Sequence, residues 1–314
     1  MPELPEVETI ARGLASRVTG DVIESVWLGS KPEPLKSPPE EIAATLESRR
    51  IAGVRRVGKH IVFDLDGTTR QWESAAAPGS VRLVKTPSKG GASRRSAGLR
   101  PARPGRRPGP TEVQIQAKAQ WIVHLGMTGR VIVCDPQAEI AKHTHAILRL
   151  ASGRELRFVD PRRFGRLSVA RGFEAGGSEP LEVEPDRFVS LFRGRKTPIK
   201  SALLNQKLLR GVGNIYADEA LFRAGLRPRR RAASLTRENF RRLHVAVRDV
   251  LTEAIALGGS SVSDYVDADG EEGFFQLQHR VYGREGEPCL VCKTPIKRVV
   301  IAGRSGHYCP KCQK

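Results

Sequence analysis

Four cysteines near the C-terminus have the spacing of a metal site. Cys289 and Cys292 are followed, after sixteen residues, by Cys309 and Cys312. Two Cys-x2-Cys pairs on the turns of a β-hairpin suit tetrahedral Zn²⁺ with four thiolate ligands. Because four protein ligands leave no position for water, we predict one zinc ion with a structural role. The fifth cysteine, Cys134, lies in an apolar run and is interpreted as a core residue.

A second group of residues has the chemistry to bind phosphate. The segment LLNQKLLRGVGNIYADEALF predicts one helix ending at Arg210-Gly211 and another beginning at Asn214. Glycines at such a turn let main-chain N–H groups approach an anion, and the start of the next helix favours phosphate. Lys200 and Lys207 add positive charge nearby. A plain connection between two helices is the alternative interpretation.

The first residues of the chain combine two prolines with acidic side chains. Pro2 and Pro5 flank Glu3 and Leu4, and Glu6 follows. Proline is tolerated in the first turn of a helix, and carboxylates there complement the helix dipole. Pro2 is therefore either a helix-start residue or a group whose nitrogen does chemistry. The spacing after Pro5 predicts a helix with an apolar stripe of Val7, Ile10, Ala11, Leu14 and Val18.

Composition and charge indicate the kind of partner. A chain of 314 residues is long enough for about two domains with buried cores. Its 53 Lys and Arg exceed its 34 Asp and Glu, giving a formal net charge of +19. Such a charge favours a polyanionic partner, since each neutralised phosphate releases counterions; a solvated basic surface is the alternative. Aromatic residues are only 5% of the chain, which argues against a base-stacking platform for single strands.

Signals for export or membrane insertion are missing from the sequence. No apolar run reaches the length of about 18 residues that a spanning helix needs. The N-terminus lacks the basic and apolar regions of a secretory signal, and five cysteines do not suggest a disulfide framework. We therefore expect a cytoplasmic protein.

Short β-rich runs fill the first half of the chain, and helical patterns fill the second. The β-rich runs predict an antiparallel sheet or sandwich, with turns at Asp66-Gly67 and Ser152-Gly153. A Gly-rich and acidic segment at 172–186 marks the change to helices. The longest predicted helix, within 234–259, has one apolar face formed by Phe240, Leu243, Val247, Val250, Leu251 and Ala254.

Residues 69–120 differ from their surroundings in composition. This window contains 11 Lys and Arg and 2 Asp and Glu, so it contributes +9 of the net charge. Its Arg, Pro, Gly and Ser content is typical of chain that cannot bury enough apolar surface to fold. We predict a flexible basic insertion at a hairpin tip. Contact with DNA phosphates and the absence of any role are both open interpretations.

Six motifs, taken in order, carry a resemblance to a known family. They are PELPEVET at the N-terminus, VGKH, HLGMTG, DPRRFG, GVGNIYADE, and VYGREGEPC before the last cysteines. Together they closely resemble the bacterial formamidopyrimidine-DNA glycosylase family, the 8-oxoguanine DNA glycosylases and abasic-site lyases. The resemblance covers the chain except for the insertion.

The resemblance implies four catalytic residues. Met1 is expected to be removed, so that Pro2 becomes the nucleophile. An α-amino group has a pKa near 8, below that of lysine, and its attack on the sugar C1′ gives an iminium that acts as an electron sink. Glu3 matches the general acid and base, with Glu6 as a second carboxylate. Lys59 and Arg304 match residues of β-elimination and δ-elimination.

The resemblance also implies how the protein holds DNA. A damaged base that leaves the stack creates a void, which apolar wedges and one polar reader fill. The void-filling residues would be Met127, Arg162 and Phe164. The DNA contacts would be His143, Arg162, Arg195, Lys200 and Asn214. Glu272 lies in the expected base-capping loop, at a position where the family pattern leads us to expect a basic, small or proline residue.

The expected fold class is α+β. An N-terminal antiparallel β-sandwich with a flanking helix would cover 1–174, followed by a hinge at 175–186. A helix–two-turns–helix domain would cover 187–278, and a four-cysteine zinc hairpin 279–314. The expected activity is removal of oxidised purines from duplex DNA by a monomer associated with the nucleoid, with β,δ-elimination. The alternatives are an enzyme for oxidised pyrimidines and a non-catalytic zinc-dependent DNA-binding protein.

Overall fold

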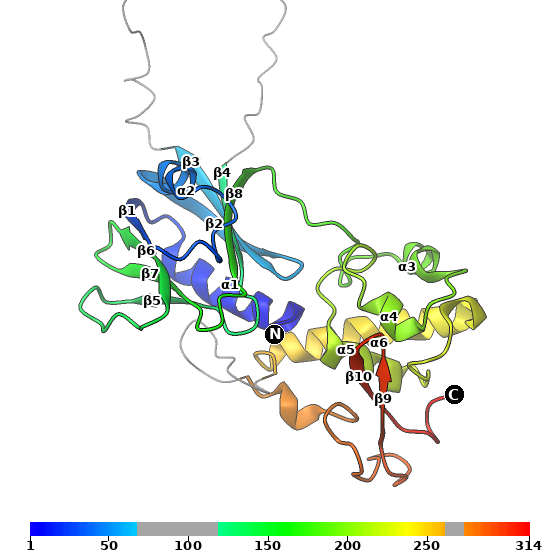
Figure 1. The fold of residues 1–314 in the computed structure, drawn as a ribbon. Helices are drawn as coiled ribbons and strands as arrows, with labels where there is room; N and C mark the ends of the chain where they lie inside the picture. Colours follow the sequence, from blue (N-terminus) through cyan, green and yellow to red (C-terminus); the bar gives the residue numbers. More distant parts are fainter. Residues whose placement is uncertain (68–118, 261–272) are drawn as a thin grey trace, which may run out of the picture. The chain divides into compact units, whose positions relative to one another are not determined.

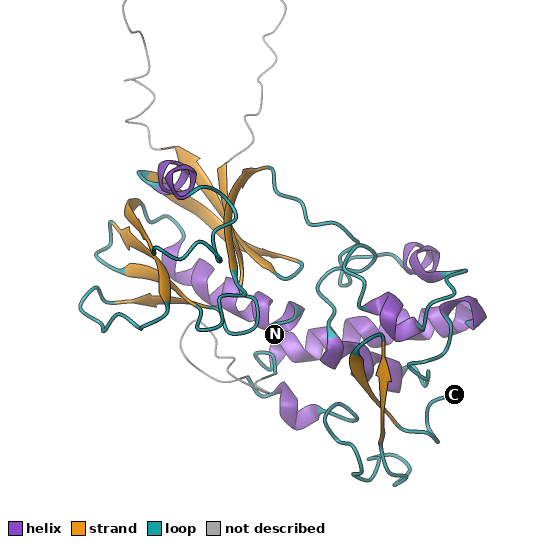
Figure 2. Ribbon diagram, in the orientation of Figure 1, coloured by secondary structure: helices purple, strands orange, loops and turns teal. Residues whose placement is uncertain are grey.

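The computed structural model describes residues 1–67, 119–260 and 273–314, and its N-terminal part contains two antiparallel sheets. Figures 1 and 2 show both sheets. The first sheet has the order β1 (Ile23–Leu28), β6 (Thr144–Leu150), β7 (Glu155–Val159), β5 (Arg130–Cys134). The second has the order β2 (Arg49–Val57), β3 (His60–Gly67), β4 (Ala119–His124), β8 (Arg166–Arg171).

One hydrophobic core joins the two sheets and α1 (Leu4–Val18). It includes Phe63 and Trp121 from the second sheet and Phe158 from the first. All five residues of the predicted α1 stripe are buried, as apolar spacing with a helical period requires. The helix begins at Leu4 because the side chains of Glu3 and Glu6 form a capping box.

Several local predictions in this part were wrong. Asp66 and Gly67 are strand residues that pair with Arg50 and Arg49, so the predicted turn does not form there. The last two residues of the predicted insertion belong to β4, since ladder pairing with β3 fixes them as a strand. Its residues 69–118, like Glu272, lie outside the described residues. Cys134 ends β5 half-buried and is not a core residue.

Other local features agree with prediction or were not foreseen. The turn at Ser152-Gly153 does connect β6 and β7, and Gly153 has the positive φ of +83° that such a turn needs. The short helix α2 (Pro39–Leu46) was not predicted. Its apolar signal is short, because only Ile42 and Leu46 are buried.

Among the described residues, four helices and two 3₁₀ turns form the next part. They are α3 (Pro185–Phe192), α4 (Ile199–Leu203), α5 (Asn214–Arg223), α6 (Arg237–Ala256), η1 (Ala232–Ser234) and η2 (Phe275–Gln278). The predicted apolar face of α6 is buried. However, α4 ends at Leu203 and not near Arg210, because the Asn205 side chain accepts from the Lys207 N–H and closes a turn.

The chain ends in a hairpin of β9 (Lys297–Ile301) and β10 (Arg304–Tyr308). A small apolar cluster beside it contains Phe222 and Val281 together with cysteine side chains. Of the helices described, none is both long and apolar enough to cross a membrane. The domain boundaries and the hinge stay predictions; α3 begins within the predicted hinge.

Candidate functional site

The start of α1 is fixed against the turn that precedes α5. The Leu4 N–H donates to the Gly211 carbonyl at 3.0 Å, and the Ile215 N–H donates to Glu3 Oε1 at 3.2 Å. Glu3 thus lies at the N-terminal end of α5, where the helix dipole favours negative charge. A Cβ on Gly213 would lie 2.1 Å from the Glu3 carboxyl carbon, so only glycine permits this approach. The anionic group that lies against the Gly-x-Gly turn in this structure is therefore the side chain of Glu3.

Glu6 supports Glu3 from the next turn of the helix. Its Oε2 accepts from the Glu3 N–H at 2.7 Å, while Oε1 accepts from the Ser260 N–H at 2.8 Å and from the Tyr216 hydroxyl. Glu6 is 2% exposed, so both oxygens are committed to internal partners. Glu6 consequently orients the N-terminus of the chain from the interior.

Burial shifts the pKa values of Glu3 and Lys59, two groups that interact electrostatically. Glu3 is 4% exposed, and burial raises its pKa to about 7, an effect that the positive charge of Lys59 opposes. Burial lowers the pKa of Lys59. The negative charge of Glu3 opposes this shift, and the positive charge of Arg304 adds to it. Within the described part of the chain, Glu3 Oε2 is buried without a hydrogen-bond partner. Pro2, half-buried next to Glu3, shares this environment.

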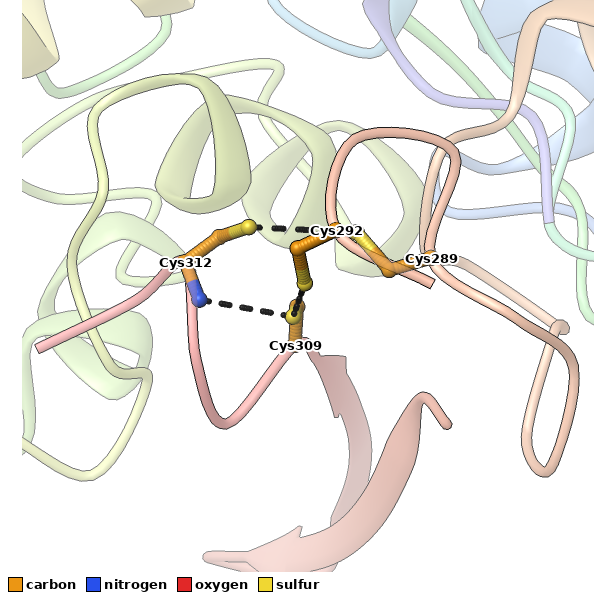
Figure 3. Close-up of side chains that lie close together, drawn as sticks. All are labelled: Cys289, Cys292, Cys309 and Cys312. Carbon is orange, nitrogen blue, oxygen red and sulfur yellow. Dashed lines mark hydrogen bonds between the residues drawn. The ribbon is translucent and has the colours of Figure 1, made fainter. Parts of the chain in front are cut away.

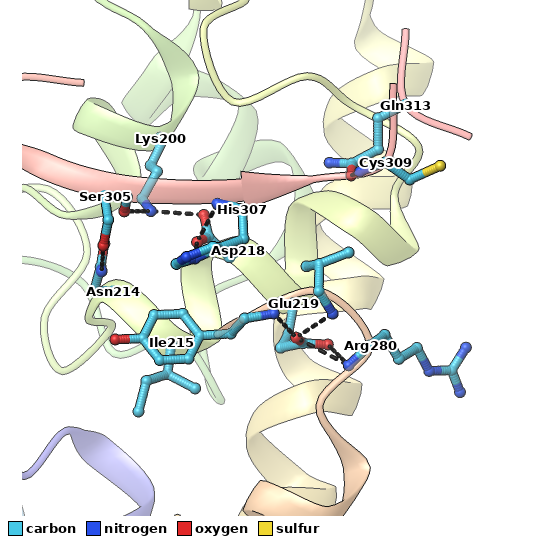
Figure 4. A network of polar contacts seen from close by, with 12 residues as sticks. Lys200, Asn214, Ile215, Asp218, Glu219, Arg280, Ser305, His307, Cys309 and Gln313 are labelled. Atoms are coloured by element: carbon cyan, nitrogen blue, oxygen red, sulfur yellow. Dashed lines mark hydrogen bonds and ion pairs between the residues drawn. The ribbon is translucent and has the colours of Figure 1, made fainter. Parts of the chain in front are cut away.

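Lys200 lies in a buried polar network between α5 and the hairpin, shown in Figure 4. Its Nζ donates to Asp218 Oδ1 at 2.6 Å and to the Ser305 carbonyl. The other oxygen of Asp218 accepts from the His307 N–H at 2.8 Å. Asn214 Nδ2 donates to Ser305 Oγ at 3.3 Å. The Lys200 side chain is 1% exposed. The residue predicted to contact phosphate therefore also holds the hairpin in place, through Asp218 and Ser305.

Two loops of the sandwich present exposed side chains. Met127, between β4 and β5, is 41% exposed, and Phe164, between β7 and β8, is 54% exposed. The Arg162 guanidinium carbon lies 5.3 Å from the centroid of the Phe164 ring. His143 is half-buried before β6, and Arg195 is exposed after α3, where its Nε donates to the Leu191 carbonyl. Exposed apolar residues beside a cation suit insertion into a base stack.

The four predicted zinc ligands come together at the base of the hairpin (Figure 3). None of the four forms a disulfide in the described structure, and their sulfur atoms lie within 4.8 Å of one another. Two of the sulfur separations are 3.4 Å, between Cys292 and Cys309, and 3.9 Å, between Cys289 and Cys312. Tetrahedral Zn–S bonds of about 2.3 Å place sulfurs roughly 3.8 Å apart, so this donor set fits zinc.

Sequence reasoning did not single out several residues that hold the site. The sequence motifs that contain these residues were recognised. However, the partners of their side chains lie far away in the chain, and no local sequence pattern indicates those contacts. Glu219, for example, accepts from three consecutive N–H groups between Arg280 and Tyr282. The residues missed in this way are Asp160, Tyr216, Asp218 and Glu219.

Comparison with known proteins matches every part of this arrangement. The formamidopyrimidine-DNA glycosylase N-terminal domain matches residues 1–167, and the H2TH domain of the same enzymes matches 177–266. A zinc finger found in FPG and IleRS matches 286–314. The formamidopyrimidine-DNA glycosylases of Solibacter usitatus and Listeria monocytogenes are 41% and 35% identical, with the whole of each chain covered.

Solved structures agree over nearly the whole chain. The MutM (FPG) protein from Thermus thermophilus is 39% identical with a TM-score of 0.75, covering 99% of this chain and 98% of its own. A Lactococcus lactis FPG in complex with DNA containing an abasic site is 28% identical with a TM-score of 0.78, covering 99% of both chains.

The fold and the three matching domains define a DNA glycosylase of the helix–two-turns–helix class, with a zinc finger and its four-cysteine cluster. The matches span the chain from its first residue to its last at substantial identity. The protein belongs to the formamidopyrimidine-DNA glycosylase family.

Proposed function

We propose that this protein is a bifunctional DNA N-glycosylase and abasic-site lyase that removes 8-oxoguanine and formamidopyrimidines from duplex DNA. The observation that carries the proposal is the Glu3 carboxyl group, buried next to Pro2 with a pKa of about 7. A carboxyl group with such a pKa exists in both protonation states near neutral pH, as general acid–base catalysis requires.

Pro2 is the proposed nucleophile after loss of Met1. Its neutral nitrogen forms a bond to the sugar C1′ as the glycosidic bond breaks, and the damaged base leaves with the bonding electron pair and takes up the proton that the Pro2 nitrogen releases. Glu3 donates a proton to the ring oxygen, which gives an open-chain iminium. The iminium then accepts electrons during β-elimination, assisted by Lys59, and δ-elimination follows with Arg304. An extra residue before Pro2 would convert the amine into an amide, which is not nucleophilic.

The proposed DNA contacts follow from exposure and charge. His143, Arg162, Arg195 and Asn214 contact the strand backbone or the orphaned base, and Met127 and Phe164 fill the void with Arg162. Lys200 Nζ has three N–H donors, of which Asp218 and Ser305 take two. The third is the one that we assign to a phosphate. One structural zinc ion, a monomeric state and a cytoplasmic location at the nucleoid complete the proposal.

Borohydride trapping of the covalent intermediate tests the mechanism. Mass spectrometry first establishes that Pro2 is the N-terminal residue. We expect borohydride to trap a protein–DNA adduct on a duplex with 8-oxoguanine opposite cytosine, and to trap none for Pro2→Gly or for protein that retains Met1. An unchanged adduct with retained Met1 would exclude Pro2 as nucleophile. Faster turnover of a thymine-glycol duplex would reassign the substrate to oxidised pyrimidines.

A further inference from the structure

Asp160 is a wholly buried carboxylate between the two loops that carry Met127 and Phe164. Its Oδ1 accepts from Thr128 Oγ1 at 2.5 Å and from the Arg162 N–H at 3.2 Å. Its Oδ2 accepts from the Gly165 N–H at 2.7 Å. Three donors from two loops therefore converge on one side chain.

The main chain of Asp160 extends these contacts to a third segment. Its N–H donates to the His143 carbonyl at 2.9 Å, and its carbonyl lies 3.0 Å from His145 Nε2. His143 is one of the proposed DNA contacts. Each proposed void-filling residue is also a partner of the carboxylate or the chain neighbour of one, because Thr128 follows Met127 and Gly165 follows Phe164.

The loops also touch through their backbones. Gly126 has φ of +66°, and a Cβ there would lie 2.5 Å from the Phe164 carbonyl carbon. The Gly126 N–H donates to His124 Nδ1 at 3.1 Å, which fixes the other side of the turn. The backbone of the Met127 loop at Gly126 therefore lies directly against that of the Phe164 loop.

The chemistry of the three donors explains a carboxylate at this position. An ionised carboxylate only accepts hydrogen bonds and offers about four lone-pair sites, whereas an amide would direct N–H groups at a donor. A turn-closing aspartate needs only the N–H groups of its own loop, Arg162 and Gly165. The bond to Thr128, 32 residues away in the chain, instead couples two loops.

We propose that Asp160 is a positioning residue that holds Met127, Arg162 and Phe164 in one fixed arrangement. Void filling and contact with the orphaned base then occur as a single event, and the preference for the base opposite the lesion depends on the carboxylate. This inference rests on the proposed function for the role of the three side chains.

Thr128→Val tests the coupling with the smallest change, because it removes the hydroxyl and leaves the shape. The measurement is the single-turnover excision rate of 8-oxoguanine opposite cytosine relative to adenine, with Arg162→Ala as reference. We expect Thr128→Val and Asp160→Asn to lower this ratio about tenfold, the loss that one charge-assisted hydrogen bond brings. Thr128→Ser, which keeps the hydroxyl, should restore the ratio. A general loss of stability would lower both rates together.

Amide hydrogen exchange in the free protein gives a second readout that needs no activity. Thr128→Val should speed exchange at Arg162 and Gly165. Ser37→Ala is the matched control, since it removes a hydroxyl that accepts from the Val169 N–H elsewhere in the sandwich. It should change neither the exchange at the two loops nor the ratio.

The two proposals fail in different ways. If the wild-type protein neither excised 8-oxoguanine nor gave a borohydride adduct, only the proposed function would be overturned. The amide exchange data would still test whether Asp160 holds the two loops together. If Arg162→Ala lost the ratio while Thr128→Val kept both the ratio and slow exchange, Asp160 would not be a positioning residue. Should Asp160→Asn fail to fold, Thr128→Val decides the question.

Discussion

At the scale of single residues, the central feature is a carboxyl group whose surroundings raise its pKa to about 7. Glu3 is buried, one of its oxygens accepts from α5, and the other has no partner in the described structure. Desolvation disfavours the charged form, so the pKa rises. The burial that makes the ionised carboxylate unfavourable therefore also keeps a proton available for the proposed transfer near neutral pH.

The pH dependence of base excision should reveal this group. The reactive form needs a neutral Pro2 amine, with a pKa near 8, and a protonated Glu3, with a pKa of about 7, so the single-turnover excision rate should be highest and nearly constant between about pH 7 and 8. Above about pH 8, loss of the Glu3 proton should lower the rate about tenfold per pH unit, and below about pH 7, protonation of the Pro2 amine should lower it by the same factor. Glu3→Gln should reduce the rate at pH 7 and abolish the alkaline decline.

Glu8→Gln provides the control on the same helix. Glu8 pairs with Arg12 and Arg56 at 2.7 Å each, away from the proposed proton transfer. This variant should keep the alkaline decline. An alkaline decline that persisted in Glu3→Gln would assign the titrating group elsewhere.

The sequence predicted this site only in part. Residue types and motif order singled out Pro2, Glu3 and Lys59, whose catalytic roles stay predictions, and the charge pattern of the first turn predicted carboxylates at a helix start. The raised pKa of Glu3 could not be predicted, because it comes from burial against segments such as the turn at Gly213, more than two hundred residues away in the chain. The same distance hid Tyr216 and Ser260 as partners of Glu6.

At the scale of elements, prediction succeeded where a periodic pattern was long. The helix α6 and the stripe of α1 followed from apolar spacing, and the hairpin followed from its cysteines. Prediction failed at short elements such as α4, whose end depends on the Asn205 side chain. It also failed at Asp66-Gly67, where pairing with β2 overrides a common turn dipeptide.

Zinc removal tests the element that the cysteines hold. Apart from the cysteines, the described part of the chain gives the apolar cluster at the hairpin three buried members, Phe222, Val281 and Ile296, too few to fix it without metal. A strong chelator should release one zinc ion per chain, measured by atomic absorption, and speed amide exchange over 286–314. Because Arg304 begins β10, δ-elimination should be lost while the sandwich keeps its protection.

Cys134→Ser is the matched control for this experiment. Cys134 lies at the end of β5 and outside the four-cysteine group. The variant should retain its zinc and its exchange pattern, whereas Cys312→Ser should bind zinc weakly. Release of zinc without faster exchange over the hairpin would contradict a structural role.

At the scale of the whole molecule, ion pairs connect segments that sequence patterns treated as separate. Arg56 in β2 pairs with Glu8 in α1 at 2.7 Å and with Glu179 at 2.8 Å. Glu179 also pairs with Arg210, before the turn at α5, at 3.1 Å. Glu179 belongs to the predicted hinge, whose composition gave no sign of these partners.

Glu179→Gln should therefore destabilise the folded chain. The side chains of Glu179 and Arg56 are 8% and 7% exposed, so the substitution leaves a buried guanidinium with one carboxylate fewer. Removing one member of a buried pair costs about 3 kcal/mol, which the free energy of unfolding in urea would register. Glu253→Gln is the comparison, because Glu253 pairs with Arg223 at a similar distance but is 50% exposed.

The exposed pair should contribute at most about 1 kcal/mol, since water and salt screen it. If both variants lost the same small amount of unfolding free energy, the Glu179 ion pairs would be no stronger than surface pairs, and they would not hold the hinge in place. A large loss confined to Glu179→Gln, and insensitive to added salt, would show that α1, β2 and the α5 turn are held together through this one carboxylate. The position of Glu3 against Ile215 would then depend on it as well.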